Sequence, residues 1–279
     1  MKEFKNGTYT GERALFALHE ATIVDCVFED GESPLKEGRN LDVSKTTFRW
    51  KYPLWYCQDV EVKDCVIEET ARSGIWYTFN IKMTDCMIAS PKTFRRSGGI
   101  TLIDCEIPNA QETLWKCKDI KLKNVKIKGD YLGFNSSDIE IDNMYLDGNY
   151  AFDGAKNIII RNSTLHTKDA FWNSENVTVI DSTIIGEYLG WNTKNITLIN
   201  CTIESHQGFC YMEKVKMVNC KLINSDLCFE YCSDLDIELV APIDSIKNPY
   251  SGKIVVPEIK ELIMDEKFID PSKTEIIIK

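Results

Sequence analysis

The chain has 279 residues and a formal net charge of −10, with 43% hydrophobic and 27% charged residues. No run approaches the roughly 18 consecutive apolar residues of a membrane-spanning helix, and the N-terminal segment lacks the apolar core of a secretion signal. These features predict a cytoplasmic protein without membrane contact, and the sign of the charge argues against nucleic acid as a partner. The charge is uneven: residues 45–128 carry 15 Lys and Arg against 10 Asp and Glu, which leaves that stretch available to an anionic ligand.

From about residue 22 to about residue 240, one short pattern returns every 19 to 21 residues. A branched apolar residue is followed by Asp or Asn, by a small residue and, two places on, by another apolar residue. Examples are the segments 24–28, 63–67, 103–107, 180–184 and 199–203. A fixed period indicates one structural unit stacked on copies of itself, which defines a solenoid.

Each repeat contains short β-branched segments separated by Asn or Asp, which tolerate the left-handed backbone of tight turns. A repeat of this length has no room for a helix beside these strands. We therefore predict an all-β fold, a right-handed parallel β-helix of about 11 coils of 19–21 residues, in one domain spanning 1–279. Residues 1–21 should form an N-terminal cap, 22–240 the coils and 241–279 a degenerate coil and cap. A leucine-rich repeat is the alternative, but its Leu-x-x-Leu-x-Leu spacing is absent.

Six of the 11 cysteines occupy the same position of the repeat, which serine fills in two further repeats. These cysteines are Cys26, Cys65, Cys86, Cys105, Cys201 and Cys220. The pattern predicts a ladder of small buried side chains, with reduced thiols that pack as small hydrophobes. Zinc ligation is the alternative, but CxxC pairs are absent. We expect neither a metal nor a cofactor.

Two adjacent columns of residues precede the strand of each repeat. The first column is apolar or glycine and comprises Leu35, Leu54, Ile75, Phe94, Leu114, Gly133, Phe152, Phe171, Gly190, Phe209 and Phe229. The second comprises Lys36, Trp55, Trp76, Arg95, Trp115, Phe134, Asp153, Trp172, Trp191, Cys210 and Glu230. Neighbours on a strand point to opposite sides, and burial of an unpaired charge is costly. We therefore expect the second column, with its tryptophans, on the outside; an interior aromatic stack is the alternative.

A polar column flanks the tryptophans and includes Lys168 and Glu187, with Tyr131, Tyr150, Asp169 and Tyr188 beside them. Salt bridges between coils would explain its charges. The functional interpretation is a groove in which rings stack on sugars while polar groups bond hydroxyls. Its expected substrate-binding residues are Trp55, Trp76, Arg95, Trp115, Tyr131, Tyr150, Lys168, Trp172, Tyr188 and Trp191.

Three acids on successive coils, Asp153, Asp169 and Glu187, are the candidate catalytic residues. The spacing of adjacent coils suits the paired carboxylates of glycoside hydrolysis. An acid beside a cation, such as Asp169 with Lys168, would instead abstract a proton next to a uronate.

The segments 11–16, 32–37, 51–56, 168–173 and 186–192 resemble an uncharacterised family of small bacterial β-helix proteins within the pectin-lyase-like superfamily. The resemblance covers nearly the whole chain. It implies the fold, and the wider superfamily implies polysaccharide lyases, polygalacturonases, epimerases and phage tailspikes. The paired Asp and Gly-His motif of polygalacturonases and the calcium-binding Asp cluster of pectate lyases are missing, so no activity is carried over.

We predict a carbohydrate-binding or carbohydrate-modifying protein that takes an oligosaccharide or another small polar ligand. The alternative is a non-catalytic scaffold whose exposed face binds a protein. The sequence leaves open whether the protein is an enzyme and what its oligomeric state is.

Overall fold

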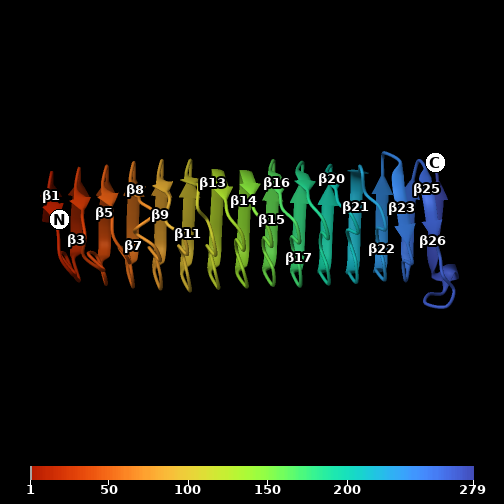
Figure 1. The fold of residues 1–279 in the computed structure, drawn as a ribbon, viewed down its shortest axis with the longest axis horizontal. Coiled ribbons are helices and arrows are strands. Elements are labelled where there is room, and N and C mark those ends of the chain that lie inside the picture. The colour runs from red at the N-terminus through yellow and green to blue at the C-terminus, as the bar shows by residue number, and fades with distance from the viewer. Residues whose placement is uncertain (1) are drawn as a thin grey trace. The chain divides into compact units, whose positions relative to one another are not determined.

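The computed structural model describes residues 2–279. Over these residues the chain makes about 15 turns of a parallel β-solenoid and contains no α-helix (Figure 1). Backbone contacts divide it into two compact units, residues 1–140 and 141–279, which we call unit 1 and unit 2.

In unit 1 one strand from each coil forms the first side of the solenoid. These strands are β1 (Lys2–Lys5), β3 (His19–Val24), β5 (Arg39–Ser44), β7 (Gln58–Lys63), β9 (Phe79–Thr84), β11 (Gly98–Ile103) and β13 (Lys118–Lys128). A second side is formed by β2 (Thr8–Tyr9), β4 (Val27–Phe28), β6 (Thr47–Phe48), β8 (Val66–Ile67), β10 (Met87–Ile88), β12 (Glu106–Ile107) and the end of β13. Each strand pairs in parallel with its counterpart in the neighbouring coil, as Leu41 does with Val60 and Val60 with Ile81.

Strand β14 (Ser137–Asp147) spans the boundary between the units. In unit 2 one side consists of β15 (Lys156–Arg161), β17 (Glu175–Ile180), β19 (Lys194–Ile199), β21 (Glu213–Leu222), β22 (Ser233–Leu239), β24 (Gly252–Val256) and β26 (Thr274–Ile278). The remaining strands are β16 (Thr164–His166), β18 (Thr183–Ile185), β20 (Thr202–Glu204), β23 (Ile243–Lys247) and β25 (Ile259–Ile263). A short 3₁₀ helix, η1 (Pro271–Lys273), precedes β26.

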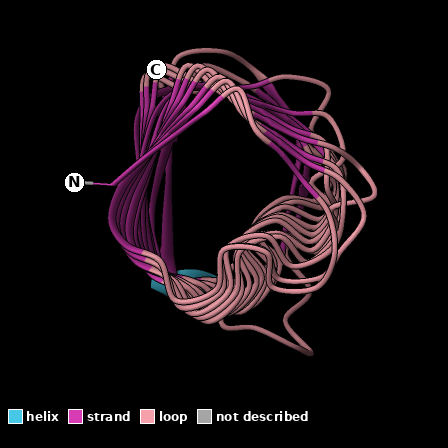
Figure 2. Cartoon of the chain, turned by 90° about the vertical axis from the view of Figure 1, so that its left-hand side faces the viewer, coloured by secondary structure: helices cyan, strands magenta, loops and turns pink. Residues whose placement is uncertain are grey.

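Alternation along each strand produces the core. In β7 the side chains of Val60 and Val62 are buried, whereas the residues on either side of them point to solvent. At the corners the backbone enters the left-handed region, where Asn and Asp predominate. Figure 2 shows the result: strands occupy two sides of the coil and turns fill the rest.

The coil count of about 11 was too low, because strands form in the segment expected to be an N-terminal cap, and the C-terminal segment extends the stack beyond the one degenerate coil expected there. Strand β1 pairs with β3, and β24 and β26 extend the pairing of β22. These segments lack the Asp-Cys pattern used for counting. Parallel pairing requires only an extended backbone with inward apolar residues, which Ile254 and Ile276 provide in β24 and β26.

The prediction of a buried cysteine ladder is confirmed. All 11 cysteines are buried and free of disulfides. Thiols such as those of Cys86 and Cys105 lie close to main-chain carbonyls of their own coil, 3.2 and 3.3 Å away. The small side chain therefore fits beside the turn without leaving a polar group unsatisfied.

The side that carries the tryptophans consists mostly of turns, whereas the predicted alternation of its two columns assumed an extended strand. Its extended pairing is limited to isolated parallel bridges that join Trp76 to Arg95 and Arg95 to Trp115. From Phe94 on, the first column adopts positive φ, for example 58° at Phe94. At Gly190, where φ is 76°, an added Cβ would lie 2.9 Å from the sulfur of Met212, so the glycine leaves room for that side chain.

Candidate functional site

The orientation of the two columns agrees with the prediction. The first column is fully buried, with Leu54, Ile75 and Phe94 at 0% exposure. Most of the second column faces outward, and the rings of Trp55, Trp76, Trp115, Phe134, Trp172 and Trp191 are half-buried. Cys210 and Glu230 are the buried members of this column. Interior ring stacking does occur, but between phenylalanines of the first column, such as Phe152 and Phe171 at 5.6 Å.

In unit 1 the second column forms a continuous stack of rings and one cation. Trp55 lies parallel to Trp76, with ring centroids 5.1 Å apart and an interplanar angle of 10°. The guanidinium carbon of Arg95 lies 5.2 Å from the ring of Trp76 and 4.5 Å from that of Trp115. Trp115 then contacts Phe134 at 4.9 Å. Arg95 is thus held between two indoles by cation–π contacts on both faces.

A second stack runs beside the first, one residue later in each coil. Tyr56 and Tyr77 lie parallel at 4.8 Å with an interplanar angle of 6°. A cation lies over the ring at each end: Lys36 is 5.4 Å from the ring of Tyr56 and Arg96 is 5.9 Å from that of Tyr77. We call the two stacks together, Trp55, Tyr56, Trp76, Tyr77, Arg95, Trp115 and Phe134, the aromatic face.

Hydrogen bonds between coils fix the indoles. The Nε1–H groups of Trp55, Trp76 and Trp115 donate to main-chain carbonyls of the following coil, at 2.6, 2.8 and 2.7 Å. The acceptor of the Trp115 bond is Tyr131, whose ring also meets Trp115 edge-on at 6.4 Å. Each indole is therefore oriented by the fold, and its donor is already used.

This geometry changes how the rings can meet a ligand. The two faces of Trp76 are covered by Trp55 and by Arg95, so the part that solvent reaches is the outer edge of the ring. The expected stacking of a sugar on a tryptophan face is therefore blocked at Trp76. A ligand would lie across ring edges and the charged groups beside them.

Charged side chains border the aromatic face. Glu112 accepts a hydrogen bond from Nη2 of Arg95 and also forms an ion pair with Lys92 at 3.4 Å. Lys51 pairs with Glu32 at 3.2 Å. Salt bridges between coils therefore explain several charges of the polar column that flanks the tryptophans.

The other predicted site residues lie in unit 2. Trp172 contacts Trp191 at 5.8 Å, and its indole donates to the carbonyl of Tyr188 at 2.8 Å. The stack continues from Trp191 to Tyr211 at 5.1 Å. Tyr150 donates its main-chain N–H to Lys168 at 2.8 Å.

The three candidate acids occupy three different columns. Glu187 belongs to the flanking polar column and Asp169 to the column beside it on the preceding coil, where the Asp169 N–H donates to the carbonyl of Glu187. The carboxylate of Glu187 pairs with Lys168 at 3.2 Å. Asp153 lies in the tryptophan column and accepts a hydrogen bond from Asn173 at 3.0 Å.

Asp169 has the most unusual environment of the three acids. Asp169 is 3% exposed, and its carboxylate forms no hydrogen bond or ion pair with the side chains of residues 2–279. Burial raises the pKa of its carboxyl, while the charge of Lys168 opposes the rise and that of Glu187 adds to it. Such perturbed groups are enriched at functional sites.

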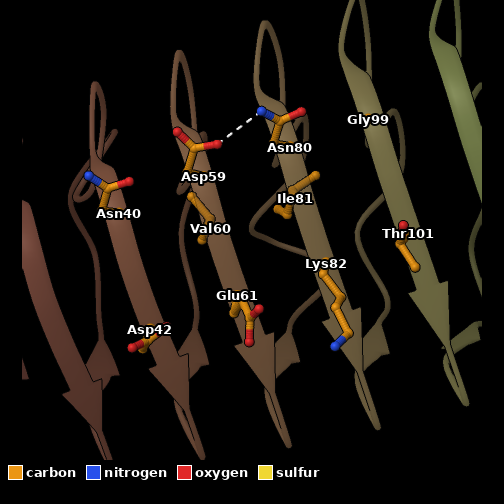
Figure 3. Close-up of a pocket in the computed structure, with 10 residues that line it drawn as sticks. All are labelled: Asn40, Asp42, Asp59, Val60, Glu61, Asn80, Ile81, Lys82, Gly99 and Thr101. Carbon is orange, nitrogen blue, oxygen red and sulfur yellow. Dashed lines mark hydrogen bonds between the residues drawn. The ribbon is translucent and has the colours of Figure 1, made fainter.

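A shallow groove of about 480 Å³ lies elsewhere in unit 1, on the outer surface of β5, β7, β9 and β11 (Figure 3). Asp42, Glu61 and Lys82 follow one another across its strands, and Asn80 donates to Asp59 at 2.9 Å. These side chains are exposed to solvent. The groove offers polar groups without an oriented apolar surface, so we favour the aromatic face as the candidate site.

Tyr56 and Tyr77 were not among the predicted site residues, although each follows a tryptophan at the repeat period, which was the available signal. In the flanking column of unit 2, His206 contacts Asp226 of the next coil, with 2.6 Å between Nδ1 and Oδ1. Over residues 2–279 no group of three or more His, Cys, Asp or Glu is arranged to hold a metal, and no helix is long and apolar enough to cross a membrane.

Stacked parallel coils with an outward column of aromatic residues place this protein in the class of parallel β-helix proteins. Residues 2–277 match the family described as "Protein of unknown function (DUF3737)", and the chain belongs to that family. A search of curated proteins gave no match.

Two solved structures illustrate the similarity. PfbA, a surface adhesin of Streptococcus pneumoniae, is 11% identical with a TM-score of 0.52, over 79% of this chain and 81% of its own. The A-module of the mannuronan C-5 epimerase AlgE4 from Azotobacter vinelandii is 10% identical with a TM-score of 0.30, over 99% and 88%. The likeness to PfbA shows a shared fold.

Proposed function

We propose that this protein binds carbohydrate through the aromatic face of unit 1. The observation that carries the proposal is the pair of ring stacks, which inter-coil hydrogen bonds and cations hold half-exposed on the exterior. Exposed apolar surface bordered by polar groups marks binding sites in soluble proteins. The rigid rings need no ordering when a ligand arrives, which lowers the entropic cost of binding.

The composition of this face favours a carbohydrate over a protein partner. Cores of protein interfaces are depleted of Lys and Glu, although aromatic residues and Arg are enriched there. Here Arg95 lies between the rings, and Glu112 and Lys92 border it. Ring edges together with donors and acceptors suit a ligand that presents hydroxyl groups beside C–H surface. PfbA, whose fold is similar, is described as an adhesin, which offers a precedent for recognition by this fold.

A glycan array with the wild-type protein tests the proposal, followed by thermal shift with each hit. We expect replacement of Tyr56 and Tyr77 by Asn to weaken binding at least tenfold. Asn tolerates their positive φ of 57° and 54°, so the backbone is preserved. Tyr145→Ala is the matched control, because this tyrosine is 45% exposed and lies in β14, outside the aromatic face. The proposal fails if no sugar at millimolar concentration shifts the melting temperature.

Acid–base catalysis on a carbohydrate is the second candidate function, and the buried carboxyl of Asp169 is the observation that favours it. A raised pKa suits a general acid, with Glu187 as the second carboxylate. The third acid, Asp153, accepts a hydrogen bond from Asn173, which would keep its carboxylate in a fixed orientation toward a bound sugar. Once a bound glycan is known, turnover should fall in Asp169→Asn and Glu187→Gln, and unchanged turnover in both variants would exclude catalysis at this cluster.

A further inference from the structure

Cations outnumber acids around the aromatic face, although the whole chain is acidic. Lys36, Arg72, Arg96 and Lys116 form no ion pair within the described residues, whereas three exposed lysines of unit 2 pair with acids of the next coil. Examples are Lys156 with Glu175 at 2.9 Å and Lys216 with Asp236 at 2.7 Å. The aromatic face is thus bordered by four cations that form no ion pair with an acid of residues 2–279.

Arg95 is the centre of this surface, and its guanidinium is incompletely used. Nη2 donates to Glu112, but the neighbouring Nε is buried without a hydrogen-bond partner. A guanidinium presents Nε–H and Nη–H in parallel along one edge, and that edge matches two oxygens of a carboxylate or sulfate. Glu112 therefore satisfies half of a site that can hold an anion by two bonds.

Glu112 is also shared, because Lys92 pairs with the same carboxylate oxygen at 3.4 Å. One acid neutralises two cations here. Its side chain is 25% exposed, so it can move into solvent and leave both cations to another anion. Indoles on both faces of Arg95 keep the guanidinium in place when that happens.

We propose that Arg95 and Lys92 form an anion-binding subsite that Glu112 occupies in the free protein, and that the ligand is a glycan bearing carboxylate or sulfate groups. The inference rests on the proposed carbohydrate binding and specifies its ligand class. The ligand anion displaces the carboxylate of Glu112 and bonds Nε and Nη2 of Arg95. The exposed cations Arg96 and Lys116 receive further anionic groups of the same chain.

Dextran sulfate and dextran test this inference, because the two polymers share a backbone and differ in charge. Titration calorimetry should show tighter binding of dextran sulfate, weakened by added salt. Glu112→Gln keeps the shape of the side chain but removes the competing anion, so affinity for dextran sulfate should rise about threefold to tenfold. Arg95→Lys should lose about tenfold while retaining the charge, because Lys cannot form the two parallel bonds. Circular dichroism verifies that both variants fold.

Glu213→Gln is the matched control, since it removes an acid paired with Lys194 in unit 2 and should leave affinity unchanged. An unchanged or lower affinity in Glu112→Gln overturns the inference. If glycans bind without preference for charge, the inference fails and the proposed function stands; if no glycan binds, both fail. If oligothymidylate binds as tightly as dextran sulfate, and Glu112→Gln raises both affinities equally, the ligand class is a nucleic acid and not a glycan.

Discussion

Asp169 illustrates how a single side chain can oppose the stability of its own fold. It occupies a turn position with φ of 56°, which Asp and Asn both tolerate. In the same column other coils have tyrosine, as at Tyr188, so the turn does not require an acid. A buried carboxyl without an ion pair is an unfavourable choice for structure alone.

Because burial raises the pKa of Asp169, the destabilisation of the fold by its carboxylate depends on pH. The folded state holds the proton more tightly than the unfolded state, so the contribution to stability is full below the ordinary pKa of 3.8 and is lost as pH rises through the folded value. We expect Asp169→Asn to raise the melting temperature at pH 7 by roughly 1–2 °C, with the difference vanishing near pH 4. Thermal unfolding from pH 4 to pH 8 measures this. Asp153→Asn is the comparison, because it perturbs a hydrogen-bonded acid and should bring no gain; a loss of stability in Asp169→Asn at pH 7 contradicts the account.

Between coils the corners are joined by ladders of amide side chains. Asn176 donates to Asn157 at 3.0 Å and accepts from Asn195 at 2.8 Å. All three residues have positive φ, between 56° and 59°. The same side chain therefore permits the turn and links successive coils.

Two substitutions of Asn176 separate its hydrogen bonds to neighbouring coils from its tolerance of the left-handed backbone. Asn176→Ala removes both ladder bonds and places a Cβ without polar compensation at φ of 57°, which should cost about 2 kcal/mol. Asn176→Gly removes the bonds but tolerates the backbone, so it should cost about 1 kcal/mol less than Ala. Urea denaturation measures both values. Equal losses for Ala and Gly would show that the left-handed backbone contributes nothing at this corner.

The repeat made the coil and its columns predictable, because each position meets the same environment in every turn. Leu54 and Trp55 were assigned to opposite sides from one rule about alternation. The number of coils was underestimated because end strands such as β1 pair without the repeat pattern. The stacking of Arg95 between two indoles was beyond the sequence, since it depends on side-chain conformations across three coils.

At the scale of the whole molecule, the buried cysteines make stability sensitive to alkaline pH in both units. Burial raises the pKa of Cys57 and Cys117 in unit 1, and of Cys210 in unit 2, from 9.0 to about 12. The thiol form is favoured in the folded state, so this stabilisation is complete below pH 9 and is lost as pH rises toward 12. At pH 10 the free energy of unfolding should therefore be lower than at pH 8 by about 1 kcal/mol for each of these thiols. Urea titrations at pH 8, 9 and 10 should therefore show a steady decline.

A triple variant with alanine at these three positions tests the cause of that decline. It is expected to be less stable at pH 8, because each change removes a buried sulfur, but its stability should fall less steeply above pH 9 than that of the wild type. Tyrosines such as Tyr211, whose pKa burial also raises, titrate in both proteins and cancel in the comparison. Ellman's reagent offers a second measurement: at pH 8 the native thiols should react only as fast as the protein opens. Parallel pH profiles for the two proteins, or rapid labelling of the native state, would mean that ionisation of Cys57, Cys117 and Cys210 does not limit the stability of the folded coils.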